Sequence, residues 1–243
     1  MKKYVILSLL LGIFSINLIA QKAEQPGIPL IGEKAPAFTA ESTRGTINFP
    51  GDYGSKWKVL FSHPADFTAV CSSELLELAQ VQGDFSKLNT ELIVISTDAL
   101  ETHRSWKESI ETVKYKNRNP KPIQFPLVAD EDRSVSRMYG MLHPGSGNTK
   151  NVRGVFIVDP SNIVRSVNFY PMEIGRNIDE IKRAIAALQV ADREKVMTPA
   201  NWNPGEDVMV KSPASAAEAE KVSNDPSSPM YKVSWYMLFK KLI

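Results

Sequence analysis

Cysteine is the scarcest reactive residue of this chain, because Cys71 is the only one among 243 residues. An intramolecular disulfide needs two thiols and is therefore excluded. Histidine is almost as rare, and His63, His103 and His143 lie scattered with no second cysteine near them. Because a structural metal site needs several clustered nitrogen or sulfur ligands, the sequence indicates no metal site.

Glycine-rich nucleotide loops and a strong net charge are missing as well. The chain contains neither Gly-x-x-x-x-Gly-Lys-Ser/Thr nor Gly-x-Gly-x-x-Gly, so we expect no nucleotide and no other cofactor. A net charge of +2 is too small to predict a nucleic-acid surface or a polybasic membrane patch. With 43% hydrophobic residues, the chain can instead bury the core of one large domain with a small annex.

The amino end differs from the rest of the chain. Two lysines precede an almost wholly apolar run from Val5 to Ile19, and Ala20 stands before Gln21. This pattern predicts a signal peptide over 1–20, so we expect an exported protein, periplasmic or secreted, with no stable membrane span after cleavage. The run is shorter than the roughly 20 residues that span a bilayer, and an uncleaved anchor is the alternative.

Hydrophobic patterning after a Pro- and Gly-rich linker, 21–33, predicts an α/β domain over 34–193. Strand-like segments alternate with helical ones, and Asn177 followed by Glu180 is typical of a helix start. We expect a mixed central sheet flanked by helices on both sides. The expected strands are 35–40, 58–62, 91–97, 126–128, 154–158 and 163–169, and the expected helices start at Cys71 or cover 100–113, 130–139 and a segment after Asn177.

The composition changes beyond Arg193, where a Pro- and Trp-containing segment leads into an Ala/Ser/Glu-rich stretch and an apolar terminus. That terminus includes Trp235, Tyr236 and Phe239, which would be costly to leave in water. We expect a small annex over 194–243 that packs on a second subunit or back on its own core. An amphipathic tail on the main domain is the alternative.

The stretch from Phe61 to Cys71 carries the chemistry. A hydrophobic strand runs into a turn at Pro64 and then into a helix, so the thiol lies at the helix amino end. Exposed N–H groups and the positive end of the helix dipole favour a thiolate there. A lone cysteine is otherwise often a small buried hydrophobe, which is the competing interpretation.

Three residues are candidates to support such a thiolate. Arg153 precedes an expected central strand and would place a permanent positive charge beside the sulfur, although a solvated strand end is the simpler role. Thr68, one helical turn before Cys71, would cap the helix or hydrogen-bond the sulfur and an incoming substrate. Pro64 lacks an N–H and would stiffen the turn and shield the sulfur from water.

Three further residues surround this set. Glu74 lies one turn after Cys71 and would hold an arginine in place, or else be a surface carboxylate. His63 would order the site or transfer a proton, or be a satisfied structural histidine. Arg176 is the remaining candidate cation.

Pro64, Thr68 and Cys71 form Pro-x-x-x-Thr-x-x-Cys, which resembles the active-site motif of the peroxiredoxins. The resemblance to the one-cysteine, peroxiredoxin-six-like subgroup covers nearly the whole chain after the signal segment. It extends over 61–68, 153–160, 175–177 and the pattern Thr198-Pro199-x-x-Trp202-x-x-Gly205-x-x-Val208.

This resemblance implies a thioredoxin-like fold with a C-terminal annex, and a thiol peroxidase that reduces hydrogen peroxide and organic hydroperoxides. Cys71 would be the peroxidatic cysteine, with Thr68, Pro64 and Arg153 completing the site and the other three candidates around it. The family also implies a homodimer in which the annex reaches towards the partner's active site.

Two departures from relatives matter. This chain has no second, resolving cysteine, so an external thiol, such as a thioredoxin-like protein or glutathione, must reduce the sulfenic acid. The segment Gly54-Ser55-Lys56-Trp57 lacks the Gly-x-Ser-x-Gly frame of the phospholipase activity of some relatives, so we do not expect that activity. A peroxide sensor or redox-regulated holdase with little turnover is the alternative function.

Overall fold

The computed structural model describes residues 27–147, 149–225 and 227–242. The expected signal peptide, 1–20, and residues 21–26 of the expected linker lie outside these ranges. Within them, none of the helices combines the length and hydropathy needed to cross a membrane.

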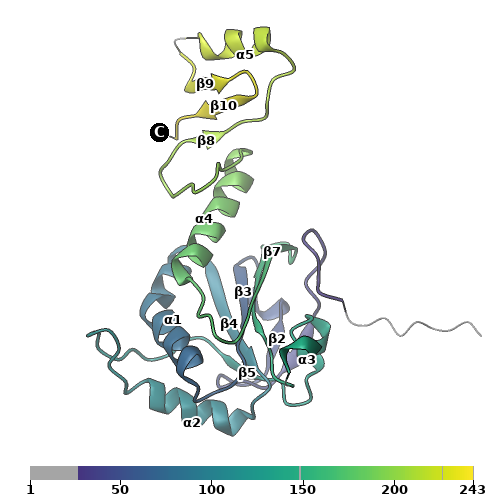
Figure 1. Cartoon of the computed structure of the whole chain (residues 1–243), viewed down its shortest axis with the longest axis vertical. Helices are drawn as coiled ribbons and strands as arrows, with labels where there is room; N and C mark the ends of the chain where they lie inside the picture. The colour runs from purple at the N-terminus through teal and green to yellow at the C-terminus, as the bar shows by residue number, and fades with distance from the viewer. Residues whose placement is uncertain (1–26, 148, 226, 243) are drawn as a thin grey trace, which may run out of the picture.

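A five-stranded mixed sheet forms the centre of the larger part of the molecule (Figure 1). Its order is β5-β4-β3-β6-β7; β3 pairs parallel to β4 and β4 parallel to β5, whereas β3 and β6, and β6 and β7, are antiparallel. Because β3 and β6 run in opposite directions, the last residue of β3 and the first residue of β6 lie at the same end of the strands. The strands are β3 (Trp57–Ser62), β4 (Thr90–Ser96), β5 (Leu127–Ala129), β6 (Arg153–Val158) and β7 (Val164–Tyr170).

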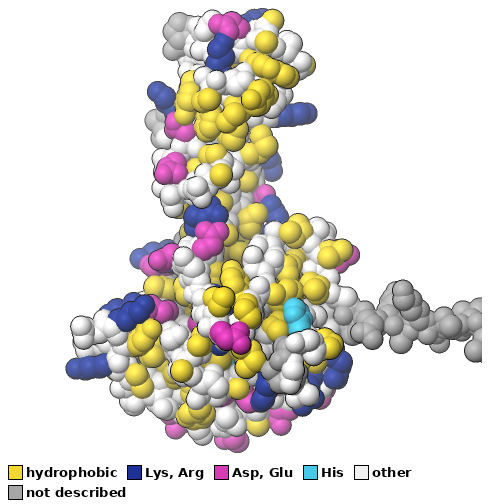
Figure 2. Space-filling model, viewed as in Figure 1, with side chains coloured by type: hydrophobic (Ala, Val, Ile, Leu, Met, Phe, Trp, Pro, Cys, Tyr) yellow, Lys and Arg dark blue, Asp and Glu magenta, His cyan; other side chains and the backbone are white. Residues whose placement is uncertain are grey.

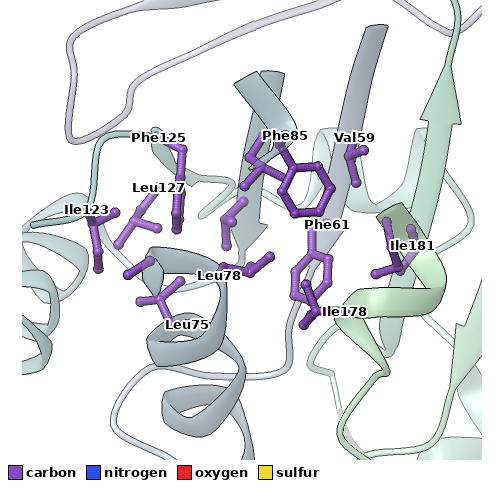
Figure 3. Close-up of a cluster of buried hydrophobic side chains, with 14 of the residues drawn as sticks. Val59, Phe61, Leu75, Leu78, Phe85, Ile123, Phe125, Leu127, Ile178 and Ile181 are labelled. Carbon is purple, nitrogen blue, oxygen red and sulfur yellow. The ribbon is translucent and has the colours of Figure 1, made fainter. Parts of the chain in front are cut away.

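Helices cover both faces of this sheet, which confirms the predicted fold class. Alternate residues of β3 point to opposite sides, since Phe61 belongs to one buried cluster and Leu60 to the other. The first cluster lies under α1 (Ala69–Lys87), α2 (Leu100–Ile110) and α4 (Ile178–Glu194), and Figure 3 shows part of it. The second cluster includes Tyr139, next to α3 (Ser134–Met138), and the two-stranded sheet of β1 (Phe38–Ala40) and β2 (Ile47–Phe49). Each fully buried Phe or Leu contributes roughly 1.5–3 kcal/mol to stability.

Two elements start several residues later than the sequence predicts. The helix expected over 130–139 covers only α3, because the buried Asp130 carboxylate accepts hydrogen bonds from the N–H groups of Val135 (3.0 Å) and Ser136 (2.7 Å). Asp130 therefore lies outside the helix and binds its first turn. The strand expected from residue 35 begins at Phe38, two residues after Pro36.

The C-terminal annex forms a small unit at the far end of α4, away from the five-stranded sheet (Figure 1). Its sheet has the order β8-β10-β9. Trp202 and Val208 are buried against Val190 near the end of α4, so part of the annex packs on its own chain. The elements are β8 (Val208–Met209), α5 (Ala216–Ser223), β9 (Met230–Ser234) and β10 (Met237–Lys240).

The apolar carboxyl terminus is only partly covered. Leu238 is buried, whereas Val233, Trp235 and Tyr236 are 66%, 47% and 54% exposed. Figure 2 shows hydrophobic side chains gathered on the annex. Such a contiguous apolar surface is typical of an interaction site.

Candidate active site

Cys71 lies in the first turn of α1, which begins two residues earlier at Ala69 rather than at Cys71 itself. Its side chain is buried with 1% of the residue exposed, and it packs in the core cluster between the sheet and α1. The sulfur is therefore shielded from bulk water, and its reactivity depends on the groups that touch it.

Arg153, the first residue of β6, touches the sulfur directly. Its Nη1 lies 3.3 Å from Cys71 Sγ and donates to Glu74 Oε2 at 2.8 Å. Nε and Nη2 both donate to the Met172 carbonyl, at 3.0 and 2.7 Å, which fixes the plane of the guanidinium. A permanent positive charge in hydrogen-bond range stabilises a thiolate relative to a thiol.

Arg176 holds Glu74 from the opposite side. The backbone N–H and Nε of Arg176 donate to Glu74 Oε1, and Nη2 donates to Oε2, each at 2.8 Å. Its Nη1 donates to the carbonyls of Ser62 (2.7 Å) and Gly154 (2.8 Å), at the adjoining ends of β3 and β6. Arg176 thereby links the end of the sheet to the helix that carries Cys71.

The Glu74 carboxylate is charged in the folded protein. Burial by itself would raise the pKa of Glu74, but the hydrogen bonds and charge of Arg176, with the charge of Arg153, hold it below its ordinary value. Two buried guanidiniums therefore share one carboxylate, and one positive charge remains in excess beside Cys71 Sγ.

The turn before α1 is held in a conformation that its residues do not favour alone. Phe67 has a left-handed φ of 54° and a side chain that is largely exposed. Thr68 occupies the N-cap position, but its hydroxyl donates to the Ala65 carbonyl at 2.9 Å rather than accepting from the helix. Pro64 is buried in the same turn. Two roles were expected for Thr68. Within the part of the chain that the structure describes, its side chain does not cap the helix.

His63 lies in a buried polar cluster beside this turn. Its Nε2 lies 2.8 Å from Asp66 Oδ1, and its ring packs on Trp106 with centroids 5.1 Å apart. Among the residues that the structure describes, His63 Nδ1 has no hydrogen-bond partner. Burial lowers the pKa of His63, and the Asp66 carboxylate offsets only part of this effect. The imidazole is therefore neutral near pH 7.

Comparisons with known proteins identify the family of this arrangement. Residues 31–167 match the model of the AhpC/TSA family, and residues 187–222 match the C-terminal domain of 1-Cys peroxiredoxin. The chain belongs to the peroxiredoxin family. A peroxiredoxin of Methanosarcina mazei is 44% identical over 215 residues, which cover 88% of this chain and 98% of the relative. A peroxiredoxin of Thermotoga maritima is also 44% identical, with the same shares covered.

Solved structures agree with this assignment. A structure of yeast mitochondrial 1-Cys peroxiredoxin superposes with a TM-score of 0.76 at 36% identity, covering 88% of this chain and all of the other. A cysteine-to-serine mutant of peroxiredoxin 6 of Arenicola marina gives 0.75 at 35% identity, covering 89% and 99%. Both confirm the thioredoxin-like fold and the one-cysteine resemblance, and the family is one of thiol-dependent peroxidases.

In this peroxiredoxin, four of the residues singled out from the sequence form one contact network. Cys71, Glu74, Arg153 and Arg176 come from α1, the start of β6 and the segment before α4. Pro64 and Thr68 lie in the turn that leads into α1, and His63 lies at its start.

The sequence did not predict the polar cluster around Asp66, the residue that contacts His63 in this peroxiredoxin. Asp66 Oδ2 lies 2.7 Å from His103 Nδ1, and the Asp66 N–H donates to Asp98 Oδ2 at 2.8 Å. Asp66 stands inside the motif segment, but nothing in the sequence showed that α2 and the end of β4 pack against it.

His63, Asp66 and Asp98 place possible metal ligands within 4.8 Å of one another. All four carboxylate oxygens are already engaged: those of Asp66 by two histidines, and those of Asp98 by Ser96, Lys150 and the Asp66 N–H. A cation would have to displace these partners, including the Lys150 ammonium.

Proposed function

We propose that this peroxiredoxin reduces hydrogen peroxide and organic hydroperoxides at Cys71, and that an external thiol restores the cysteine. The observation that carries the proposal is the 3.3 Å contact between Arg153 Nη1 and Cys71 Sγ in a buried site with one excess positive charge. This environment favours the nucleophilic thiolate.

In the reaction, the Cys71 thiolate attacks one peroxide oxygen in line with the O–O bond. An S–O bond forms, the O–O bond breaks, and the departing oxygen takes up a proton to leave as water or an alcohol. The sulfur loses two electrons to the peroxide and becomes a sulfenic acid.

Arg153 would stabilise the charge that develops on the departing oxygen. A guanidinium has about five N–H donors, and the contacts with Met172, Cys71 and Glu74 use four of them. The remaining N–H on Nη2 can donate to the peroxide. Stabilising charge where it develops in the transition state is the strongest effect that such a site supplies.

Thr68 and Pro64 would orient the substrate and exclude water. Because the Thr68 hydroxyl hydrogen is committed to the Ala65 carbonyl, its oxygen is free to accept a hydrogen bond from the peroxide O–H. Pro64 offers no N–H and forms an apolar wall of the turn. The neutral imidazole of His63 would order this turn or take up a proton.

Recycling requires two equivalents of thiol from outside the chain, since Cys71 is the only cysteine. The first thiol condenses with the sulfenic acid, giving a mixed disulfide and water. The second attacks this disulfide and releases the Cys71 thiolate. The candidate reductants are a thioredoxin-like protein, glutathione or another small thiol. For yeast mitochondrial 1-Cys peroxiredoxin, glutathione and thioredoxin systems resolve the thiol.

The test combines rate and product. Reduced protein is mixed with hydrogen peroxide or an alkyl hydroperoxide by stopped flow, and the product is trapped for mass spectrometry as Cys71 sulfenic acid. Each candidate thiol is then added to the sulfenic form, and the return of the free thiol is followed. Peroxide consumption at the wild-type rate in Cys71→Ser would overturn the proposal, and recycling by none of the thiols would favour a sensor.

We also propose that the protein is a homodimer. The strand β7 is at the edge of the five-stranded sheet, and the annex exposes the apolar side chains of Val233, Trp235 and Tyr236. Val164, the first residue of β7, bonds to the backbone of Gly32 and Glu33. Beyond it, the edge strand and the apolar patch both favour association with a second copy.

Analytical ultracentrifugation tests this. Trp235→Ser combined with Tyr236→Ser should weaken the dimer, while Ile31→Ser, which changes a side chain 68% exposed outside the annex, should not. A wild-type monomer at micromolar concentration would contradict the proposal.

Export is proposed from the amino-terminal pattern of residues 1–20. A mature protein that begins at Gln21, read by terminal sequencing of the protein purified from its native cells, would support it. A retained Met1 would instead support the anchored alternative.

A further inference from the structure

Asp66 occupies the centre of the turn that leads into the peroxidatic helix, and each of its polar backbone and side-chain contacts reaches a different element. Oδ1 meets His63 at the end of β3, Oδ2 meets His103 of α2, and the N–H donates to Asp98 after β4. The residue is 7% exposed. The turn that contains Pro64 and Thr68 is thus held in place through one residue, Asp66.

The acceptors that face His103 show which of its ring nitrogens carry a hydrogen atom. His103 Nε2 lies 3.0 Å from the Val128 carbonyl, which can only accept, so Nε2 carries a hydrogen. The 2.7 Å contact between His103 Nδ1 and Asp66 Oδ2 needs a second hydrogen. A hydrogen therefore lies between these two atoms, and the hydrogen bond to the Asp66 carboxylate is charge-assisted.

The same cluster opposes strain in the turn. Phe67, directly after Asp66, is a bulky residue in the left-handed region at φ 54°, and its exposed side chain has little packing to hold it there. If the contacts of Asp66 were lost, Phe67 could relax to an ordinary φ, and Thr68 would move with it.

We propose that His103 is a positioning residue for the peroxidatic reaction. Its Nδ1–H fixes Asp66, and Asp66 fixes the turn from Pro64 to Thr68 against the helix that carries Cys71. Asp98 supports the same turn from the rim of the site, where Ser96 (2.9 Å) and Lys150 (2.9 Å) donate to its carboxylate. The inference rests on the proposed peroxidase function and adds residues that contact neither sulfur nor peroxide.

Two substitutions separate the two hydrogen bonds of His103. Asparagine places an amide N–H near the Nδ1 position and can still donate to Asp66, whereas glutamine places it near Nε2 and can donate only to Val128. Both are neutral and remove the ring. Tyr139→Phe is the matched control, because it deletes a buried hydrogen bond to the Pro36 carbonyl on the other face of the sheet.

The experiment compares the full-length variants by the second-order rate constant with hydrogen peroxide and by the rate of Cys71 alkylation with iodoacetamide. We expect His103→Gln to slow the peroxide step about 10-fold or more, since misplacement by ~1 Å can cost ~100-fold. We expect His103→Asn and Tyr139→Phe to stay within about threefold of the wild type. Alkylation needs no oriented peroxide and should not slow in parallel.

The other outcomes overturn the inference. Equal slowing by His103→Asn and His103→Gln would show that the ring volume matters and not the bond to Asp66, and two variants like the wild type would show that the bond is irrelevant. Parallel slowing of alkylation and peroxide reduction would show a general change at the thiol.

A second variant guards against misfolding of the first. Asp98→Ala changes a side chain at the rim and removes the acceptor of the Asp66 N–H, so it should slow the peroxide step about threefold or more. An unchanged rate would overturn the support assigned to this contact. Failure of the wild type to consume peroxide would instead reject the proposed function, and it is seen before any variant is compared.

Discussion

Replacing Arg153 with methionine tests the charge beside the sulfur most directly. At 3.3 Å, a unit charge interacts with a thiolate by about 5 kcal/mol for an effective dielectric constant of ~20. That value is a ceiling, because Arg176 and the helix amino end remain. Loss of one donor that stabilises developing charge typically costs ~100- to 1,000-fold in rate, and we expect the peroxide step to slow by that range.

The structure also indicates that this variant will fold. Glu74 keeps its three bonds to Arg176, so no buried carboxylate is left without a partner. The Met172 carbonyl loses its two donors, which should cost about 1–3 kcal/mol. By contrast, Arg176→Met would remove the side-chain hydrogen bonds of Arg176 to Glu74 and to the Ser62 and Gly154 carbonyls and cost about 3–5 kcal/mol.

The assay is stopped-flow reduction of hydrogen peroxide by the reduced protein, together with thermal unfolding of each variant. Arg104→Met is the control, because Arg104 is an exposed arginine of α2 that pairs with Glu101. If Arg153→Met reacts within about threefold of the wild type while remaining folded, the guanidinium is not what activates the sulfur.

Three further results are expected. Because burial holds the pKa of His63 below its usual 6.5, the unfolded chain binds a proton that the native protein does not; stability to urea should therefore fall as pH drops from about 7 to 5, and His63→Gln should flatten this slope. Gly154→Ala would place a Cβ 2.9 Å from Ser62 Oγ. We expect the free energy of unfolding in urea to fall by about 1–3 kcal/mol. An unchanged urea midpoint would show that the neighbouring atoms accommodate the methyl group without cost. Cys71 in the native protein should be alkylated by a bulky maleimide much more slowly than in urea, since it is 1% exposed; equal rates would contradict its burial.

The fold class was predictable because the central strands are mostly apolar and because a helix start can carry a local signal. Asn177 illustrates this, since its side chain accepts from the Glu180 N–H as the sequence pattern predicts. Where a side chain caps a helix from a few residues before it, the predicted boundary was wrong, as at Asp130, whose carboxylate accepts from backbone N–H groups of α3 from outside the helix.

The candidate site shows the same division. Cys71 and Thr68 are neighbours along the chain, and the motif that joins them is visible in the sequence. The cluster of Asp66, His103 and Asp98 was not predictable, because residues 32 and 37 positions apart meet only once α2 and β4 are packed. Local spacing carries no information about such contacts.

The contact between Arg153 and Cys71 spans 82 residues of chain. Until β6 has joined β3, the cysteine has no guanidinium beside it, so a growing or partly folded chain carries a thiol without its activating charge. Under the activating role proposed for Arg153, the rate of reaction with peroxide reports completion of the sheet. Measured during refolding, this rate would show when β6 assembles, without any attached label. A chain that is still folding would also be protected from oxidation at its single cysteine.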